Sequence, residues 1–358
     1  MTSDSTGVAI VGCGNIATRY AADLARYPEM RLAGAHDVLP ERAEALAAPH
    51  GGRVYGSLDE VVADDAVDIV VNLTVHRAHY DVIRRCLEAG KHVHSEKPLA
   101  LTREEAADLV EIAESRGLRL GCAPATFLGE AQQTALKLLR EGRVGPVRLV
   151  YAEVNWGRIE AWHPEPDGFY AVGPLFDVGV YPLTIVTAAL GPARRVTAFA
   201  SVVHPRRRRL DGAEFTITTP NYVVANVEFD GGVLLRLTCC FYVGNDSTRQ
   251  KGLEFHGDDG SLLLESWHDF DPTLEVRAPG RDPEPIPLLR EPYRGVEWGR
   301  AVRDLAAAIR EGRPHRATGR QAAHVVEILC AAKESYENGK PVDLTSDFTP
   351  PAPMDWAV

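Results

Sequence analysis

The stretch that decides the fold is residues 8–17, which read Val-Ala-Ile-Val-Gly-Cys-Gly-Asn-Ile-Ala. The apolar residues at its start predict a buried β-strand, and the glycines mark the turn into a helix. Gly12 permits a tight turn, Gly14 lets the main chain approach a pyrophosphate, and Ala17 lets helix and strand pack closely. The free N–H groups at the helix start would face that anion. The residues of this turn that we expect to contact a dinucleotide are Gly12, Gly14, Asn15 and Ile16.

A carboxylate follows at the end of the next predicted strand, Leu32–Ala35. Asp37 lies at the distance from the glycine turn at which an acidic residue binds the ribose of NAD and repels the extra phosphate of NADP. No arginine follows it directly, and Arg42 lies a turn into the next helix. The sequence therefore predicts NAD, with NADP as the less favoured alternative. Cys13, inside the turn, is either a reactive thiol at a helix start or a small filler.

The alternation of elements predicts two domains with different sheets. Up to about residue 125, short apolar runs alternate with helical patterns, which is typical of an α/β doubly wound parallel sheet, the Rossmann fold. Later runs are joined by hairpin signals such as residues 230–232, Asp-Gly-Gly, which predict an α+β domain with a large, mostly antiparallel open sheet. We expect residues 1–125 to bind the dinucleotide and residues 126–358 to bind substrate and mediate oligomerisation.

The composition excludes several classes of protein. The 358 residues carry 39 Lys and Arg against 50 Asp and Glu, a formal charge of −11, which argues against a nucleic-acid partner. Met1–Gly7 has neither a basic stretch nor an apolar core, which predicts no signal peptide. No apolar run approaches the ~20 residues of a membrane span, and the six scattered cysteines suggest reduced thiols. The sequence thus predicts a cytoplasmic protein without a membrane partner.

Residues 96–98, Glu-Lys-Pro, follow a predicted strand, His92–His94. Ligands bind at the carboxyl ends of the strands in open α/β sheets, and a lysine before proline has a restricted main chain. Partial desolvation and a nearby cationic nicotinamide would lower the pKa of Lys97, which suits proton transfer. The alternative is an ordinary solvated lysine.

Asp177 and Tyr181 form a second candidate pair, four residues apart in a helix predicted over Leu175–Leu190. Residues at that spacing share one helix face. An acid and a phenol presented together would bind a substrate hydroxyl and relay its proton. Taken singly, they are read more simply as a capping aspartate and a core tyrosine.

Other polar residues are ambiguous. The loop with Arg158, Trp162 and His163 is either the lining of a sugar site or ordinary core and loop. The run Arg206–Arg209 is read as a solvated loop, with recognition of an anionic partner as the alternative. Four histidines lie near residue 90 in the sequence, namely His76, His79, His92 and His94. No cluster of Cys or Asp accompanies them, so we expect no metal site.

Together, these motifs resemble the glucose–fructose oxidoreductase / inositol dehydrogenase / MocA family. The resemblance implies NAD(P)-dependent oxidation or reduction of sugars, cyclitols or related polyols, and a second-domain sheet that often forms a dimer interface, hence a homodimer or homotetramer. It implies that Lys97 contacts both cofactor and substrate, and that Asp177 orients the reacting hydroxyl. Further cofactor contacts implied or expected around these motifs come from Thr74, His76, His79 and Glu96.

The chain departs from the family pattern at two places. The catalytic histidine usual four residues after the aspartate is Tyr181, and the usual arginine–aromatic pair before the sixth helix is Thr126-Phe127, with Phe127 a candidate for substrate binding. Because the pKa of tyrosine is about 10 against about 6.5 for histidine, either a neighbour such as Lys97 lowers it or the phenol donates without ionising. Either Lys97 or Tyr181 is then the proton acceptor.

The sequence therefore predicts an NAD-dependent oxidoreductase that transfers a hydride between nicotinamide C4 and a secondary hydroxyl or ketone of a sugar, glycoside or cyclitol. One alternative is an enzyme that keeps NAD tightly bound and uses transient sugar oxidation for glycosidic-bond chemistry. Another is a regulator of the same fold that senses NAD or sugar without turnover.

Overall fold

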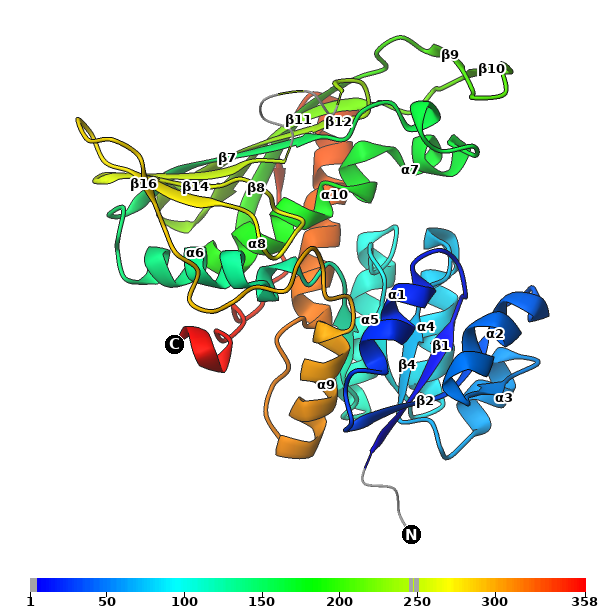
Figure 1. Ribbon diagram of the computed structural model, residues 1–358. Coiled ribbons are helices and arrows are strands. Elements are labelled where there is room, and N and C mark those ends of the chain that lie inside the picture. Colours follow the sequence, from blue (N-terminus) through cyan, green and yellow to red (C-terminus); the bar gives the residue numbers. More distant parts are fainter. Residues whose placement is uncertain (1–4, 245–246, 248–250) are drawn as a thin grey trace. The chain divides into compact units, whose positions relative to one another are not determined.

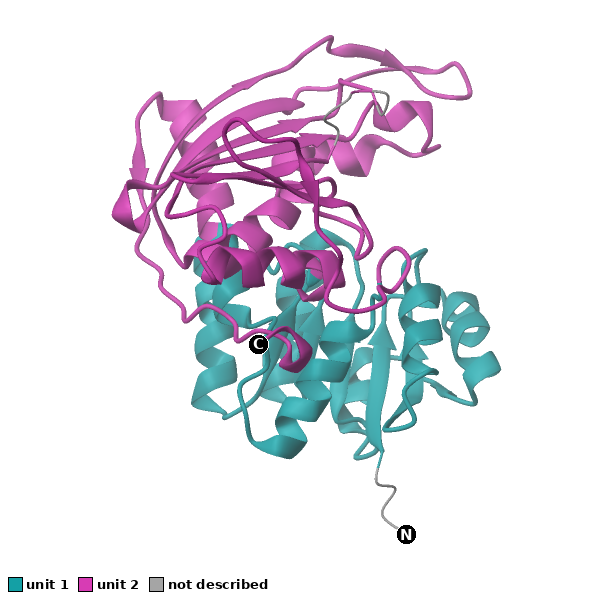
Figure 2. Cartoon of the chain, turned by 60° about the vertical axis from the view of Figure 1, so that its left-hand side comes forward, with its two compact units in different colours: residues 1–125, 297–326 teal, residues 126–296, 327–358 magenta. Residues whose placement is uncertain are grey.

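The computed structural model describes residues 5–244, 247 and 251–358 (Figure 1). Residues 1–4, part of the segment for which no signal peptide is predicted, lie outside the described residues. The chain forms two compact units, coloured separately in Figure 2. The first comprises residues 1–125 and 297–326, and the second comprises residues 126–296 and 327–358.

The first unit contains a six-stranded sheet, counted over the described residues, in which every pairing is parallel. The spatial order β3-β2-β1-β4-β5-β6 is that of a Rossmann fold, as predicted. The strands are β1 (Thr6–Val11), β2 (Met30–His36), β3 (Arg53–Val54), β4 (Ile69–Asn72), β5 (His92–Ser95) and β6 (Leu120–Cys122).

Two helices of this unit begin at a residue whose side-chain hydroxyl caps the helix. The Ser57 hydroxyl accepts a hydrogen bond from the Glu60 N–H, and the Thr102 hydroxyl accepts one from the Glu105 N–H, both at 3.2 Å. The helices are α1 (Ala17–Leu24), α2 (Pro40–Ala47), α3 (Leu58–Ala63), α4 (His79–Glu88), α5 (Arg103–Ser115) and α9 (Arg300–Glu311).

Helix α9 lies with the first unit, although its residues were expected in the domain 126–358. Val302 and Leu305 are buried in the same apolar cluster as Tyr20 of α1. The apolar stripe of an amphipathic helix has to be buried, but its sequence does not state against which sheet. The following helix, α10 (Gly319–Asn338), has residues in both units.

The second unit contains a nine-stranded sheet, again counted over the described residues. It is mostly antiparallel, as predicted, but β7 and β12 pair in parallel. Its order is β16-β15-β14-β13-β7-β12-β11-β8-β17. Its strands are β7 (Val147–Asn155), β8 (Ala193–Ser201), β11 (Tyr222–Phe229), β12 (Leu234–Cys240), β13 (Leu253–Gly257), β14 (Gly260–Leu264), β15 (Leu274–Arg277), β16 (Glu284–Pro285) and β17 (Val342–Asp343).

Side chains alternate between the two faces of this sheet. In β11, Val223 and Val227 are buried, whereas Tyr222 is exposed on the opposite face. Helices α6 (Glu130–Arg140), α7 (Asp167–Asp177) and α8 (Val180–Leu190) pack together beside the sheet in Figure 1. On the outer face, Phe199 of β8 is 74% exposed.

The helix predicted over Leu175–Leu190 is two helices, α7 and α8. Within α7, Gly173 has φ 78° and ψ 164°, and Pro174 follows it without an N–H to donate. A Cβ on Gly179, between the helices, would lie 2.5 Å from the carbonyl oxygen of Leu175. The shared face expected for Asp177 and Tyr181 therefore does not follow from one helical period.

Over the described residues, one stretch, Asp167–Leu190, is apolar and long enough to cross a membrane by length and composition. The sequence predicts no such stretch, because glycine and proline interrupt the apolar residues. In the structure 83% of its apolar window is buried, and it combines α7 and α8. Such burial is typical of core helices in a packed domain.

Candidate functional site

The glycine turn lies at the carboxyl edge of the parallel sheet, where the order of the strands reverses between β1 and β4. Gly12 has φ +90°, and a Cβ there would lie 2.6 Å from the carbonyl carbon of Leu73 and 2.7 Å from the nitrogen of Thr74. A Cβ on Gly14 would meet no atom of the described residues within 4 Å. Gly12 is thus required by the fold, whereas Gly14 leaves open space in front of α1.

Asp37 holds this turn in place. Its Oδ2 accepts a hydrogen bond of 2.6 Å from the N–H of Cys13, and its Oδ1 accepts one of 2.9 Å from the N–H of Leu39. Burial and the negative charge of Asp37 raise the pKa of the Cys13 thiol to about 12, so the thiol is protonated at neutral pH. Of the two interpretations of Cys13, the structure therefore favours the small filler.

These features fit a dinucleotide. The half-buried Asp37 carboxylate keeps lone pairs for ribose hydroxyls, because each oxygen accepts only one of these main-chain bonds. The space before Gly14 lies at the start of α1, where main-chain N–H groups favour an anion. Asn15 is exposed and Ile16 is partly exposed at the same helix start.

The Glu96–Lys97 pair follows β5, at the same edge of the sheet as the glycine turn. Glu96 is buried, with Oε1 accepting from the Tyr20 hydroxyl at 2.9 Å and Oε2 accepting from the N–H of Lys97 at 3.1 Å. Glu96 thus fixes the main chain of Lys97, whose side chain is half-buried. Direct contact of Glu96 with a cofactor stays a prediction.

His79 connects the segment after β4 to the segment after β5. Its ring is fully buried, with Nδ1 2.7 Å from the carbonyl oxygen of Pro98 and Nε2 3.0 Å from that of Thr74. Burial lowers the pKa of His79, outweighing the two carbonyl oxygens that favour its charged form. His79 is therefore a positioning residue and does not reach solvent. The ring of half-buried His76 lies edge-on to it, with centroids 5.9 Å apart.

Asp177 and Tyr181 lie in the second unit, at the end of α7 and the start of α8, and both are buried. The Tyr181 ring packs against Trp267 and His268, with centroids 5.1 Å and 5.3 Å away. The hydrogen bond from His268 lowers the pKa of Asp269. Sequence analysis missed Trp267 and His268, although residues 267–269, Trp-His-Asp, could have been noted as an aromatic–histidine–acid run.

The residues predicted to line a substrate site differ in their burial and in their surroundings. Phe127 is fully buried in a 3₁₀ turn, Thr126–Leu128, and its contact with a substrate stays a prediction. Trp162 is 47% exposed and lies edge-on to the rings of His163 and Phe169. These aromatic side chains form a small surface group, and its contact with a sugar stays a prediction.

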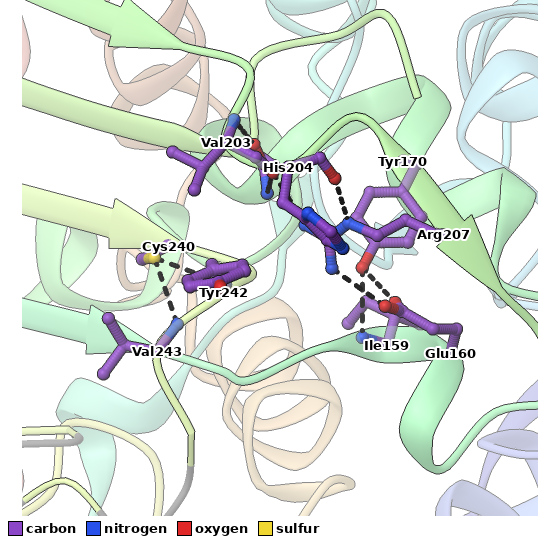
Figure 3. A network of polar contacts seen from close by, with 10 residues as sticks. Ile159, Glu160, Tyr170, Val203, His204, Arg207, Cys240, Tyr242 and Val243 are labelled. Atoms are coloured by element: carbon purple, nitrogen blue, oxygen red, sulfur yellow. Dashed lines mark hydrogen bonds and ion pairs between the residues drawn. The ribbon is translucent and has the colours of Figure 1, made fainter. Parts of the chain in front are cut away.

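Arg158 lines a different feature, a pocket formed with the arginine run. The run was expected as a solvated loop, but residues 206–208 form strand β9, paired with β10 (Glu214–Thr216). Arg207 is buried and bonded to Glu160, as Figure 3 shows. The difference arises because alternate side chains of a strand point to opposite faces, so one arginine of the run is turned inward.

Neither a metal cluster nor a disulfide contributes to these arrangements within the part of the chain that the structure describes. His94 of β5 is fully buried, and neither of its ring nitrogens has a hydrogen-bond partner among the described residues.

Comparison with known families identifies both parts of the chain. Residues 6–123 match the GFO/IDH/MocA oxidoreductase family with its NAD-binding Rossmann fold, and residues 132–263 match the GFO/IDH/MocA C-terminal domain. This chain belongs to the GFO/IDH/MocA family of oxidoreductases. The resemblance expected from the motifs is confirmed, as is the class of dehydrogenases and reductases.

Individual relatives match most of the chain. The chain is 27% identical to dTDP-3,4-didehydro-2,6-dideoxy-alpha-D-glucose 3-reductase of Streptomyces antibioticus, over 93% of this chain and 99% of that protein. It is 26% identical to scyllo-inositol 2-dehydrogenase (NADP(+)) of Bacillus subtilis, over 81% and 83%. The solved aldose-aldose oxidoreductase of Caulobacter crescentus superposes with a TM-score of 0.82 at 22% identity, over 95% and 100%, and shows the shared fold.

Proposed function

We propose that this protein is an NAD-dependent oxidoreductase that transfers a hydride between nicotinamide C4 and a secondary hydroxyl or ketone of a sugar, glycoside or cyclitol. The relatives named above support the substrate class, since one acts on a dTDP-linked sugar and another on an inositol. The observation that carries the proposal is the Glu96–Lys97 pair, which presents a half-buried lysine at the cofactor-binding edge of the sheet.

The preference for NAD rests on Asp37. In this fold an acidic residue after the second strand binds the adenine ribose of NAD, and the charge of Asp37 would repel a 2′-phosphate. The related scyllo-inositol 2-dehydrogenase uses NADP(+) by its name, so the choice differs within the family and is a property of this chain's own residues.

The catalytic roles follow from the chemistry of the side chains. Bound NAD supplies the hydride acceptor at C4. We assign removal of the hydroxyl proton to Lys97, assisted by Tyr181, while Asp177 accepts a hydrogen bond that orients the hydroxyl. Oxidation of the carbinol to a ketone would leave the hydroxyl proton on the Lys97 amine or on a Tyr181 phenolate, and bound NAD would take the hydride.

A screen of NADH absorbance against hexoses, inositols, glycosides and keto-sugars tests the proposal. Lys97→Met should lower kcat by about 10²- to 10⁴-fold, the usual contribution of a general base, while NAD binding stays measurable. Tyr181→Phe, which keeps the ring on Trp267, should lower kcat without changing NAD affinity. Lys340→Met, at an exposed lysine, is the matched control.

The same screen separates the alternatives. Product formation without net NADH would indicate tightly held NAD and transient oxidation. Binding of NAD and sugar without turnover would indicate a regulator. Full activity of Lys97→Met would contradict the catalytic assignment, and wild-type protein inactive with every substrate and both nucleotides would contradict the function.

We further propose that the outer face of the nine-stranded sheet forms a homodimer or homotetramer interface. Large apolar side chains are exposed on this face, namely Leu149, Phe199, Tyr222 and Leu234. Exposed apolar patches of this kind mark association surfaces. Light scattering should show an oligomer that Phe199→Asp dissociates, and a monomeric wild type would contradict the assignment.

A further inference from the structure

A pocket of about 550 Å³ in the second unit is walled largely by arginine side chains. Its volume is in the range of small-molecule sites, roughly 300–1,000 Å³. It lies between the segment after β7 and the segment leading through β9. The residues that line it are Arg158, Glu160, Ala161, His204, Arg206, Arg207, Arg208, Arg209, Leu210 and Glu214.

Arg207 anchors the wall of this pocket. Its side chain is 1% exposed, and its Nη1 lies 2.8 Å from Oε1 of Glu160. Its Nη2 donates to the carbonyl oxygen of Val203 at 2.9 Å, and the Tyr170 hydroxyl donates to the other oxygen of Glu160 (Figure 3). The charge of Arg207 is therefore balanced, and its role is to hold the neighbouring segments in a fixed arrangement.

Two further arginines of the pocket are also paired. Arg208 lies 3.0 Å from Glu214, and Arg209 lies 2.7 Å from Asp167. These contacts neutralise most of the arginine run, which explains how four consecutive cations are accommodated in one hairpin.

Arg158 and Arg206 are different. Both are exposed, and neither has a carboxylate within ion-pair distance among residues 5–244, 247 and 251–358. The Arg158 guanidinium lies over the Tyr242 ring, 4.4 Å from its centroid, which orients it without balancing its charge. Among the described residues, the pocket thus holds two positive charges without an ion-pair partner, on a chain whose formal charge is −11.

We propose that this pocket binds the phosphate or diphosphate group of an anionic sugar substrate, with Arg158 and Arg206 as its ligands. This inference rests on the proposed function, because it assigns the phosphate to the substrate that is oxidised. A guanidinium donates parallel hydrogen bonds to two phosphate oxygens, and two guanidiniums match the charge of a dianion.

Helix α7 connects this pocket to the candidate catalytic residues of the same unit. Tyr170, which bonds to Glu160, is seven residues before Asp177 on the kinked α7. A regular helix would cover these seven steps in about 10 Å, the length scale of a sugar joined to a diphosphate, and the extended main chain at Gly173 adds to that length. The proposal therefore places the sugar of a substrate held by its phosphate on the Asp177 side of the pocket.

Isothermal titration of the full chain with uridine diphosphate, pyrophosphate and inorganic phosphate tests the site. Arg158→Gln and Arg206→Gln should each weaken binding of uridine diphosphate by about 10- to 100-fold, the effect of losing a hydrogen bond between charged groups. Arg281→Gln, an exposed arginine of the same unit outside the pocket, should leave binding unchanged. Absence of binding, or equal loss in all three variants, would overturn the proposal.

The probes also separate a substrate phosphate from a free anion. Inorganic phosphate binding as tightly as uridine diphosphate would assign the pocket to a free anion and overturn the substrate assignment. Competition by an acidic polypeptide, with no binding of the small probes, would assign it instead to a protein partner. Because titration needs no turnover, a protein that binds uridine diphosphate but oxidises no polyol would contradict the proposed function while leaving the anion site intact.

Discussion

The carboxylate of Asp37 accepts a hydrogen bond of 2.6 Å from the main-chain N–H of Cys13. The side chain that would select the cofactor therefore also holds the turn that would bind its pyrophosphate. Under the proposed function, cofactor choice and cofactor affinity would be coupled through this one side chain.

Replacing Asp37 by Asn tests the charge while keeping an oxygen that can accept the Cys13 hydrogen bond. We expect the affinity for NADP relative to NAD to rise by about tenfold or more, since a repelled 2′-phosphate and a charge-assisted bond are each worth over 1 kcal/mol. Fluorescence titration of both nucleotides measures the ratio. Glu41→Gln, at an exposed acid on α2, is the control, and an unchanged ratio in Asp37→Asn would contradict the role of the carboxylate.

The two glycines of the turn provide a matched pair. Gly14→Ala adds a methyl group to open space, so stability should stay within about 0.5 kcal/mol while NAD binding weakens. Gly12→Ala places the methyl group against Leu73 and Thr74 at a positive φ, and should lower stability by about 1–3 kcal/mol. Urea unfolding with NAD titration separates the effects. Equal NAD affinity of wild type and Gly14→Ala would show that the cofactor does not occupy this space.

The buried His94 side chain should make the stability of the protein depend on pH. Burial, with a smaller effect from nearby His315, lowers the pKa of His94 to about 3 in the folded protein, against about 6.5 when unfolded. Below about pH 6.5 the unfolded chain gains a proton that the folded chain lacks, so stability falls toward pH 3 by up to about 1.4 kcal/mol per unit. The contribution is fully restored above about pH 6.5.

His94→Leu should remove this part of the acid dependence. Between pH 8 and pH 5, the free energy of unfolding of the wild type should fall by about 2 kcal/mol more than that of His94→Leu. Urea unfolding at the two pH values measures both changes. His50→Leu, at an exposed histidine of the same unit, should follow the wild type. If the difference between wild type and His94→Leu is the same at both pH values, His94 does not titrate on unfolding.

Adjacent arginines of β9 should differ in their contribution to stability. Arg207→Met leaves the buried Glu160 carboxylate without its ion pair and should lower the free energy of unfolding by about 3–5 kcal/mol. Arg208→Met removes a solvent-exposed pair with Glu214 and should have no measurable effect. Guanidinium unfolding curves of the two variants make the comparison, and similar midpoints would contradict the burial of Arg207.

Local sequence signals predicted much of the first unit. The turn at Gly12 and the caps at Ser57 and Thr102 depend on residues close in the chain. The break between α7 and α8 also has local causes, at Gly173, Pro174 and Gly179. The continuous apolar pattern of the segment nevertheless favours a single helix.

Other features had no local signal. That Arg207 turns inward to Glu160, that His79 lies between two carbonyl oxygens, and that Tyr181 packs on Trp267 depend on segments far apart in the chain. The sequence by itself determined the Rossmann turn, the family and the candidate residues, because hydrophobic period, glycine geometry and capping act over a few neighbouring residues. Only the tertiary structure decided which of those side chains are buried, because burial and charge pairing depend on the elements that pack against them.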